Sequence, residues 1–174
     1  LRWHRRDWLR VSIALEHHPF VKHERRALLD DSPWRRVLAA RHLALVGSHA
    51  SRRALRRGLA RGPEMVSLAC ARSLARYRDL AALRWVLEHP HVLAHRPRNV
   101  LASVFQSFGR KGGHELSAAL EQEFEHPHVE CAVLDAAGRL HERAARAAIE
   151  RELHSPLLDV RVAAIRALGE MQAV

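Results

Sequence analysis

The sequence has few of the residues that build sheets or cross-linked folds. Aromatic residues make up 5% of the chain and β-branched residues are sparse, whereas Ala, Leu and Arg dominate. This composition favours helix over sheet. The two cysteines, Cys70 and Cys131, are too few for a disulfide framework, and we expect both to be reduced and buried in helices. Eight Gly and seven Pro exclude a collagenous or low-complexity chain.

Long apolar runs and targeting signals are also missing. The longest promising uncharged run, residues 99–109, has 11 residues, well short of the ~20 that a helix needs to cross a bilayer. No segment resembles a secretory signal. Because the chain begins at Leu1 rather than at Met, we expect it to be part of a longer protein.

The first ten residues combine two tryptophans with several basic side chains. Trp3 and Trp8 among these arginines resemble the interfacial belt just cytoplasmic of a membrane helix. A basic cluster there gains roughly 1 kcal/mol per Lys or Arg near an anionic leaflet. We therefore predict a cytoplasmic chain at the inner face of a membrane, the soluble part of an anchored protein. The alternative is that Trp8, Val11 and Leu15 pack as a first helix while the arginines stay in water.

The charge is distributed unevenly along an otherwise ordinary globular composition. The 174 residues are 48% apolar and 28% charged, with a net charge of +10. Residues 1–61 hold 15 Lys or Arg against 5 Asp or Glu, whereas residues 62–174 hold 14 against 14. The excess therefore lies in the first third, and it predicts an anionic partner there.

A short phrase and an apolar stripe recur along the chain. Residues 88–92 read Glu-His-Pro-His-Val, residues 125–129 repeat them, and variants occur at 16–21 and 153–158. Each stripe has helical spacing, as in Val160, Ala164, Leu168 and Met171. Copies of the stripe begin 31, 34, 29 and 31 residues apart, at Arg35, Val66, Val100, Val129 and Val160. A period near 31 residues matches a two-helix repeat unit.

More polar helices are expected between these stripes. They cover residues 50–61, 79–88, 114–125 and 142–153. Gly47, Gly109 and Gly169 fall where the first helices of the units should end, as C-terminal caps do. Residues 90–97 contain two prolines and are expected to form a kinked connector.

The last stripe carries a family resemblance. Residues 159–169, Asp-Val-Arg-Val-Ala-Ala-Ile-Arg-Ala-Leu-Gly, resemble the first helix of the short HEAT-like repeat, the kind also found in phycobilisome lyases. The resemblance covers roughly residues 20–174, although earlier copies depart from the motif, as where Cys70 replaces an Ala and Phe105 and Phe108 replace smaller aliphatics.

The resemblance implies an all-α fold and a particular architecture. It implies a right-handed α-α superhelix, a HEAT-like solenoid of about five helix pairs with a period of ~31 residues. In this family the first helices form the convex face and the second helices line a concave surface that often holds a protein partner. We expect a single domain over residues 1–174, in which residues 1–31 form a basic N-terminal helical cap. Residues 32–174 would hold the repeats and end on an unpaired helix.

Signatures of catalysis and metal binding are absent from the sequence. It contains no Gly-rich phosphate loop, Cys-x-x-Cys, His-Glu-x-x-His or Gly-x-Ser-x-Gly. The 14 histidines lie mostly between helices, and two His that flank a Pro do not chelate like a helical i, i+4 pair. We therefore expect no enzyme activity, no cofactor and no metal site.

The strongest local feature is the arginine-rich stretch 51–61. Its arginines recur at a spacing of four residues, so that their guanidinium groups share one helix face with no acid in the same helix. The predicted anion- or partner-binding residues are Arg52, Arg53, Arg56, Arg57 and Arg61, with Arg25 and Arg26 nearby. The alternative is a solvated basic face offset by acids of adjacent helices, such as Glu24 or Asp79.

We predict from these features a non-enzymatic protein-interaction scaffold with a basic N-terminal surface. A protein partner is expected first, and the charge also suits an acidic partner, an anionic membrane surface or nucleic acid. The alternative is a nucleic-acid-binding HEAT-like protein, because some HEAT-like solenoids resemble DNA glycosylases. Such a cleft would draw on Trp34, Trp85 and Asp79.

The C-terminal helix, residues 156–171, has no second helix after it. Val160, Ile165 and Leu168 are expected to leave apolar surface there. A solenoid end normally carries a polar capping face. We therefore predict that the array continues in the parent protein or that this helix associates with another chain.

Overall fold

The computed structural model describes residues 5–172, and it describes side chains from residue 10 onward. Trp3 and Trp8, on which the predicted membrane contact depends, lie outside the described side chains. All regular secondary structure within the described residues is helical, with no strand, which confirms the predicted all-α class. None of the described helices is both long enough and apolar enough to cross a membrane.

The chain divides into two compact units, Leu1–Tyr77 and Arg78–Val174. We call them unit 1 and unit 2. The described helices of unit 1 are α1 (Arg5–Glu16), α2 (Pro19–Ala27), α3 (Pro33–Val46), α4 (His49–Arg61) and α5 (Glu64–Ala75). Those of unit 2 are α6 (Leu80–Glu88), η1 (Pro90–Val92), α7 (Arg98–Ser107), α8 (Arg110–Ala119), α9 (Pro127–Arg139), η2 (Arg143–Ala145), α10 (Arg146–Arg151), η3 (Glu152–His154) and α11 (Leu158–Gln172).

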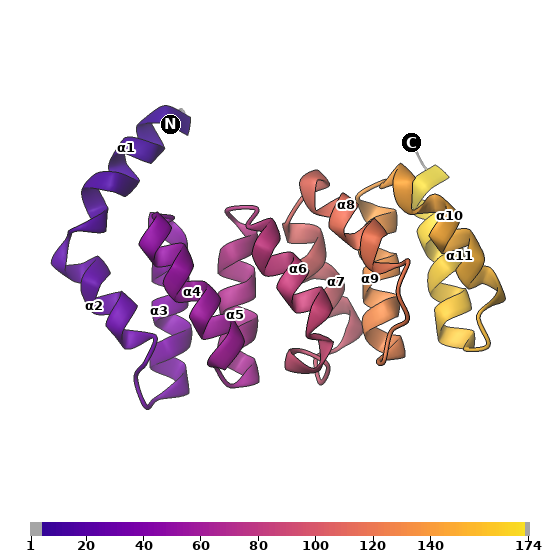
Figure 1. Cartoon of the computed structure of the whole chain (residues 1–174), viewed down its shortest axis with the longest axis horizontal. Coiled ribbons are helices and arrows are strands. Elements are labelled where there is room, and N and C mark those ends of the chain that lie inside the picture. The colour runs from indigo at the N-terminus through magenta and orange to yellow at the C-terminus, as the bar shows by residue number, and fades with distance from the viewer. Residues whose placement is uncertain (1–4, 173–174) are drawn as a thin grey trace. The chain divides into compact units, whose positions relative to one another are not determined.

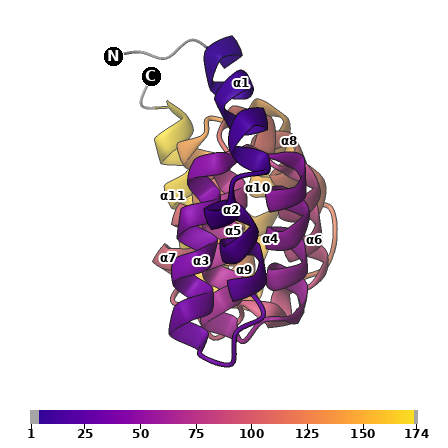
Figure 2. The same cartoon turned by 90° about the vertical axis from the view of Figure 1, so that its left-hand side faces the viewer.

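In unit 1, α3 and α5 lie side by side and α4 packs in front of them (Figure 1). Seen from its N-terminal side, α2 lies across both α3 and α4 (Figure 2). The turn between α3 and α4 is sharp because Gly47 adopts φ 66, a left-handed conformation that glycine tolerates. Ser48 then caps α4 by accepting a hydrogen bond from the Ser51 amide at 3.1 Å. The predicted cap at Gly47 is thus confirmed, and it fixes where the arginine-rich helix begins.

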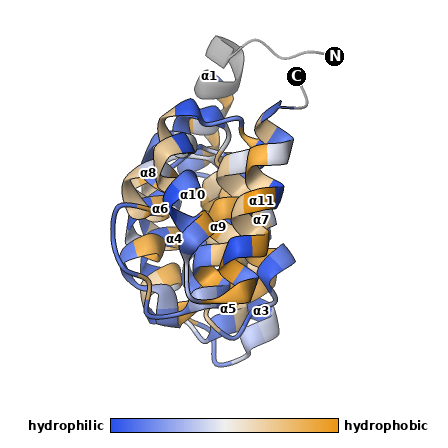
Figure 3. Ribbon diagram, turned by 90° about the vertical axis from the view of Figure 1, so that its right-hand side faces the viewer, coloured by the Kyte–Doolittle hydropathy of each residue, from blue (hydrophilic) through white to orange (hydrophobic). Residues whose placement is uncertain are grey.

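In unit 2, α9 packs between α7 and α11, while α6 packs on α8 (Figure 1). Figure 3 shows the contrast within this unit: α9 is mostly apolar, whereas hydrophilic residues colour much of α10. Helices α9 and α11 approach closely because a Cβ at Gly138 would lie 2.7 Å from the Ala167 Cα. The core is built on large side chains that are fully buried, including Phe105, Phe108 and Leu134.

Two details of the predicted helices are wrong. Gly169 does not end a helix, because α11 continues to Gln172 and Gly169 lies on its exposed side. The helix predicted over residues 114–125 is instead α8, which runs from Arg110 to Ala119. Gly112 and Gly113 fit inside it because of close contacts: a Cβ at Gly113 would lie 2.1 Å from a carboxylate oxygen of Glu142.

The C-terminal helix matches its predicted surface only in part. Val160 is fully buried rather than exposed, and Leu168 is half-buried. Ile165 is 62% exposed, and Leu158 and Val162, which share its face, are 63% and 39% exposed. An apolar face therefore exists on α11, although one of its predicted members belongs to the core.

Each unit carries one of the two cysteines in its core. Cys70 of α5 and Cys131 of α9 are free thiols, and both are buried, as predicted. Burial raises the pKa of Cys70 to about 12, even though Arg36 opposes the shift. Burial also raises the pKa of Cys131 above its ordinary value. Both thiols are therefore held in the unreactive protonated form.

Candidate functional site: an arginine groove in unit 1

A groove of about 640 Å³ runs between α2 and α4. Its polar wall is made of arginines from both helices and from α3, and its apolar floor includes Leu28 and Leu29. Two adjoining hollows, of about 430 and 450 Å³, extend it along the same helices. We call these hollows together the arginine groove; its cationic side chains are Lys22, Arg25, Arg26, Arg36, Arg52, Arg53, Arg56, Arg57 and Arg61.

All seven arginines predicted as binding residues line this groove. The structure thus brings Arg25 and Arg26 of α2 together with the five arginines of α4. No Asp or Glu is among the described residues that line any of the three hollows. A wall of cations without a single lining carboxylate creates a positive potential that attracts anions.

Some of these guanidinium groups have partners inside the fold. Arg25 forms an ion pair with Glu16 of α1, and the Nε of Arg36 donates to the Leu28 carbonyl oxygen at 2.9 Å. Arg56 also has an interaction partner within the chain. These contacts hold the wall of the groove in place.

Other arginines of the groove have no acidic partner among the described residues. Arg26, Arg57 and Arg61 are exposed, and none of them forms an ion pair there. Arg53 contacts only the ring of His49, with 3.3 Å between the two nitrogens. The Nε of Arg52 is buried and has no hydrogen-bond acceptor within the described residues. These groups leave several N–H donors for an external anion.

Glu24 does not offset the basic face of α4. Its side chain is 1% exposed, and its oxygens lie 3.0 Å from Arg35 and 3.1 Å from the Nδ1 of His42. Both partners belong to α3, so that the carboxylate holds α2 against α3 instead. Asp79 belongs to unit 2, where it caps α6 by accepting a hydrogen bond from the Ala82 amide at 3.2 Å.

Leu29 is the part of the groove that sequence reasoning missed. It follows α2 and is 82% exposed amid the arginines, whereas the adjacent Leu28 is 2% exposed. The Leu-Leu pair after a short helix was the available signal, because only one of two successive leucines there can face the core. Lys22, Arg36 and His49 were missed as well.

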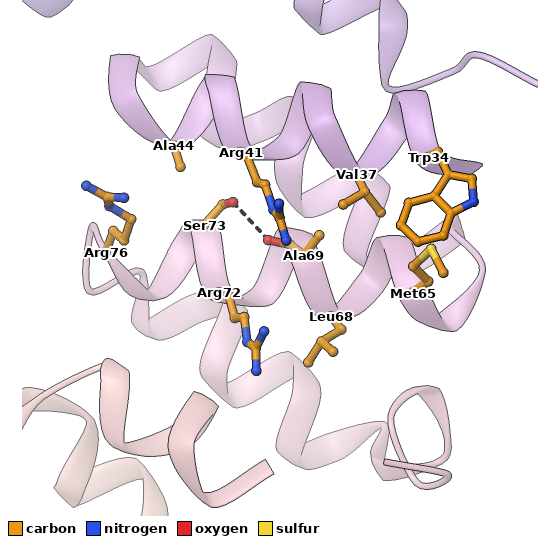
Figure 4. A pocket seen from close by; sticks show the side chains of 10 residues that line it. All are labelled: Trp34, Val37, Arg41, Ala44, Met65, Leu68, Ala69, Arg72, Ser73 and Arg76. Carbon is orange, nitrogen blue, oxygen red and sulfur yellow. Dashed lines mark hydrogen bonds between the residues drawn. The ribbon is translucent and has the colours of Figure 1, made fainter. Parts of the chain in front are cut away.

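A second, smaller groove lies between α3 and α5. Its volume is about 250 Å³, below the ~300–1,000 Å³ of small-molecule sites. Figure 4 shows Trp34 and Met65 together at one end and Arg76 at the other, with Arg41 between them. Trp34 is 71% exposed. The Ser73 hydroxyl is already used, since it lies 2.9 Å from the Ala40 carbonyl oxygen and 2.8 Å from that of Ala69.

The residues considered for a glycosylase cleft have separate structural surroundings. Trp34 belongs to unit 1, and Asp79 and Trp85 belong to unit 2. Asp79 is the N-cap of α6, and Trp85 stacks on His89 with the ring centroids 4.4 Å apart. Neither unit alone holds the full set.

The histidine phrases bring no metal site together in the part of the chain that the structure describes, which contains no group of three or more His, Cys, Asp or Glu side chains able to hold an ion. His89 and His91 have ring centroids 6.0 Å apart, as do His126 and His128. His128 also contacts the Ala94 carbonyl oxygen. These histidines are therefore partly packed, contrary to the expectation of fully exposed turn residues.

No protein-family model matches the sequence, and no curated protein matches it significantly. The arginine groove is therefore the main physical clue to function.

Proposed function

We propose that this protein is a non-enzymatic α-solenoid of the HEAT-like kind, and that it binds an acidic segment of a partner protein in the arginine groove. The solenoid part of the proposal draws support from the stripes repeated about every 31 residues. It also draws support from the packing of consecutive stripe helices, α3 on α5 in unit 1 and α7, α9 and α11 in unit 2. Stacked two-helix repeats commonly present an extended binding surface.

The observation that carries the binding proposal is the acid-free lining of the groove. Nine cationic side chains converge there, and like charges at i, i+4 on α4 disfavour the helix by a few tenths of a kcal/mol per pair. Such an arrangement does not contribute to the stability of the chain. A bound polyanion would remove the repulsion and use the free N–H donors of Arg53, Arg57 and Arg61.

The apolar floor favours a peptide over a nucleic acid. Leu29 is 82% exposed at the centre of the basic wall, and an apolar side chain of a partner would cover it. No aromatic ring lines the described groove, although base-stacking aromatics are typical of sites for single-stranded nucleic acid. An acidic peptide that carries one apolar residue matches both features.

The test uses fluorescence anisotropy at about 0.15 M salt. The probe is a short fluorescein-labelled poly-glutamate peptide with one central Leu. We expect wild-type protein to bind it, and Arg53→Glu/Arg57→Glu to weaken binding by at least about tenfold, since each charge-assisted hydrogen bond contributes about 1.5–3 kcal/mol. Circular dichroism should show the same helix content in the variant.

Arg41→Glu/Arg72→Glu is the matched control, because it makes the same charge change in the α3–α5 groove of the same unit. It should change the affinity for the peptide by less than about twofold, since long-range effects between exposed charges are screened at this salt. Equal losses in both double variants would mean that the peptide senses only net charge. That result would overturn the proposal.

Nucleic-acid binding is the second candidate, and the α3–α5 groove favours it. An exposed tryptophan beside three arginines has the composition of a surface that stacks bases and contacts phosphates. A labelled duplex and a labelled single strand should be titrated over a range of salt. Tight binding with a log–log salt slope of about −4 or steeper, lost in Trp34→Ala, would establish this function in place of the first.

A further inference from the structure

Unit 2 carries a groove of opposite character between α6, α8 and the loop that follows α8. Its volume is about 360 Å³. Four glutamates surround an apolar centre: the lining includes Glu88, Glu115, Glu123 and Glu125 around Leu87, Pro90 and Phe124. We call it the glutamate groove. Only one cation, Arg84, is among its described lining residues.

Arg84 neutralises one of these carboxylates and leaves the others. Its guanidinium group makes a two-pronged contact with Glu115, with distances of 3.0 and 2.8 Å. Hydrogen bonding to Arg84 lowers the pKa of Glu115 below its ordinary value. Glu88, Glu123 and Glu125 are exposed and form no ion pair among the described residues. The groove therefore has three free carboxylates around a half-buried Phe124.

The two grooves are complementary in charge and in polarity. Unit 1 holds 17 Lys or Arg against 6 Asp or Glu, and unit 2 holds 12 against 13. The arginine groove has an exposed leucine inside a basic rim, and the glutamate groove has Leu87 and Phe124 inside an acidic rim. An apolar centre with a charged rim is the usual anatomy of a protein–protein interface, and opposite rims fix which surfaces meet.

We propose that the glutamate groove of one copy of this chain docks on the arginine groove of a second copy. This inference rests on the proposed function, since it assigns the acidic partner to the chain itself. The contact is heterologous, because each copy uses a different surface. Two such contacts close a dimer, whereas one contact repeated from copy to copy builds an open chain.

The experiment measures the mass of the full chain by sedimentation velocity as the protein concentration rises, at low salt and at about 0.15 M salt. We expect the average mass to rise with concentration, and more strongly at low salt. Arg53→Glu/Arg57→Glu should be monomeric, and so should Glu123→Arg/Glu125→Arg. A wild-type chain that stays monomeric throughout would overturn the inference.

Mixing the two variants provides the sharper test. One variant keeps an intact glutamate groove and the other keeps an intact arginine groove, so that one contact can form between them. We expect the equimolar mixture to give a one-to-one complex and nothing larger. If both variants self-associate like wild type while Leu158→Ser/Ile165→Ser does not, the interface is the apolar face of α11, and the inference is wrong.

The poly-glutamate probe separates this inference from the function on which it rests. Glu123→Arg/Glu125→Arg should bind the probe as wild type does, and excess probe should dissociate wild-type assemblies because it occupies the same groove. If wild type binds the probe but never self-associates, only the second copy as partner is excluded. If wild type fails to bind the probe, the proposed function itself fails.

Discussion

The two units use arginine in different ways. In unit 2 several arginines contact acids of other helices: Arg98 meets Asp135, Arg84 meets Glu115 and Arg151 meets Glu121. In unit 1 the arginines of α4 line an acid-free groove. The same residue type at similar helical positions thus joins helices in one unit and creates a charged surface in the other. What decides between the two roles is the number of acids on the neighbouring helix.

The buried carboxylates show the same contrast on a smaller scale. Asp135 of α9 is 6% exposed and contacts Arg98 of α7 at 2.7 and 2.6 Å, with Arg166 of α11 3.9 Å away. It therefore connects three helices. Glu24 connects only α2 and α3. The stability of unit 2 should accordingly depend more on its charge pairs than that of unit 1.

The largest expected effect comes from Asp135→Ala. It leaves the partly buried guanidinium group of Arg98 without its partner, and we expect the free energy of unfolding to fall by about 3–5 kcal/mol. Urea unfolding measures this change. Glu121→Ala removes an exposed pair instead, in which the two side chains are 55% and 54% exposed, and it should cost less than about 1 kcal/mol. Equal losses would remove the distinction between buried and exposed pairs.

The next largest effect tests the close packing of α9 on α11. Gly138→Val places a side chain where a Cβ alone would lie 2.7 Å from the backbone of Ala167, and overpacking of this kind costs about 1–3 kcal/mol. Gly169→Ala is the matched control on α11, since a Cβ there meets nothing within 4 Å. It should raise the thermal midpoint, because Ala in a helix is favoured over Gly by about 1 kcal/mol. A tolerated Gly138→Val would show that the two helices separate easily.

A smaller effect concerns the pH dependence of unit 2. Burial, and then the neighbouring carboxylate Glu152, raise the pKa of Glu130 from 4.5 to about 7. Between these values the folded chain keeps a proton that the unfolded chain releases, so that this contribution to stability is complete below pH 4.5 and is lost as the pH rises through 7. Because Glu130 is half-exposed, solvent screening reduces the effect.

Glu130→Gln should therefore be more stable than wild type at pH 8, by about 1 kcal/mol, and equal to it at pH 4. Thermal melts at the two pH values check this difference. A gain of the same size at both pH values would mean that packing, rather than titration, is responsible.

The smallest effect is expected in the arginine groove. Arg57→Glu places a carboxylate between Arg53 and Arg61 on α4, and i, i+4 pairs of opposite charge stabilise a helix by about 0.2–0.5 kcal/mol each. The variant should therefore be slightly more stable than wild type while it binds the acidic probe less well. A marked loss of stability would show that Arg57 has a structural role that the described contacts lack.

Much of the helical pattern could be predicted from local signals, and the exceptions have identifiable causes. The left-handed turn at Gly47 and the buried thiols of Cys70 and Cys131 follow from spacing and composition. Gly169 was assigned as a cap because glycine after a helical stripe usually ends the helix, but its surroundings are open and the helix continues. The start of α8 was missed because Gly112 and Gly113 weaken the helical signal, and only packing against Leu83 and Glu142 explains them.

The candidate site was predictable in its residue types but not in its shape. The spacing of arginines on α4 indicated a charged face, and the structure adds the wall contributed by α2 and Arg36. The exposure of Leu29 and the pairing of Glu24 with α3 depend on how α2 packs, which no local pattern specifies. The glutamate groove was not predicted, because Glu88 and Glu123 are far apart in sequence and meet only across α6 and α8.

The single buried thiol in each unit makes the molecule its own reporter of opening. Cys70 and Cys131 react with an alkylating reagent only when the surrounding core separates, since burial keeps both thiols protonated. Mass spectrometry of the two cysteine-containing peptides would therefore give an opening rate for each half of the chain in one unlabelled sample. Under a partner in the arginine groove, the rate at Cys70 would slow while the rate at Cys131 would remain the internal clock.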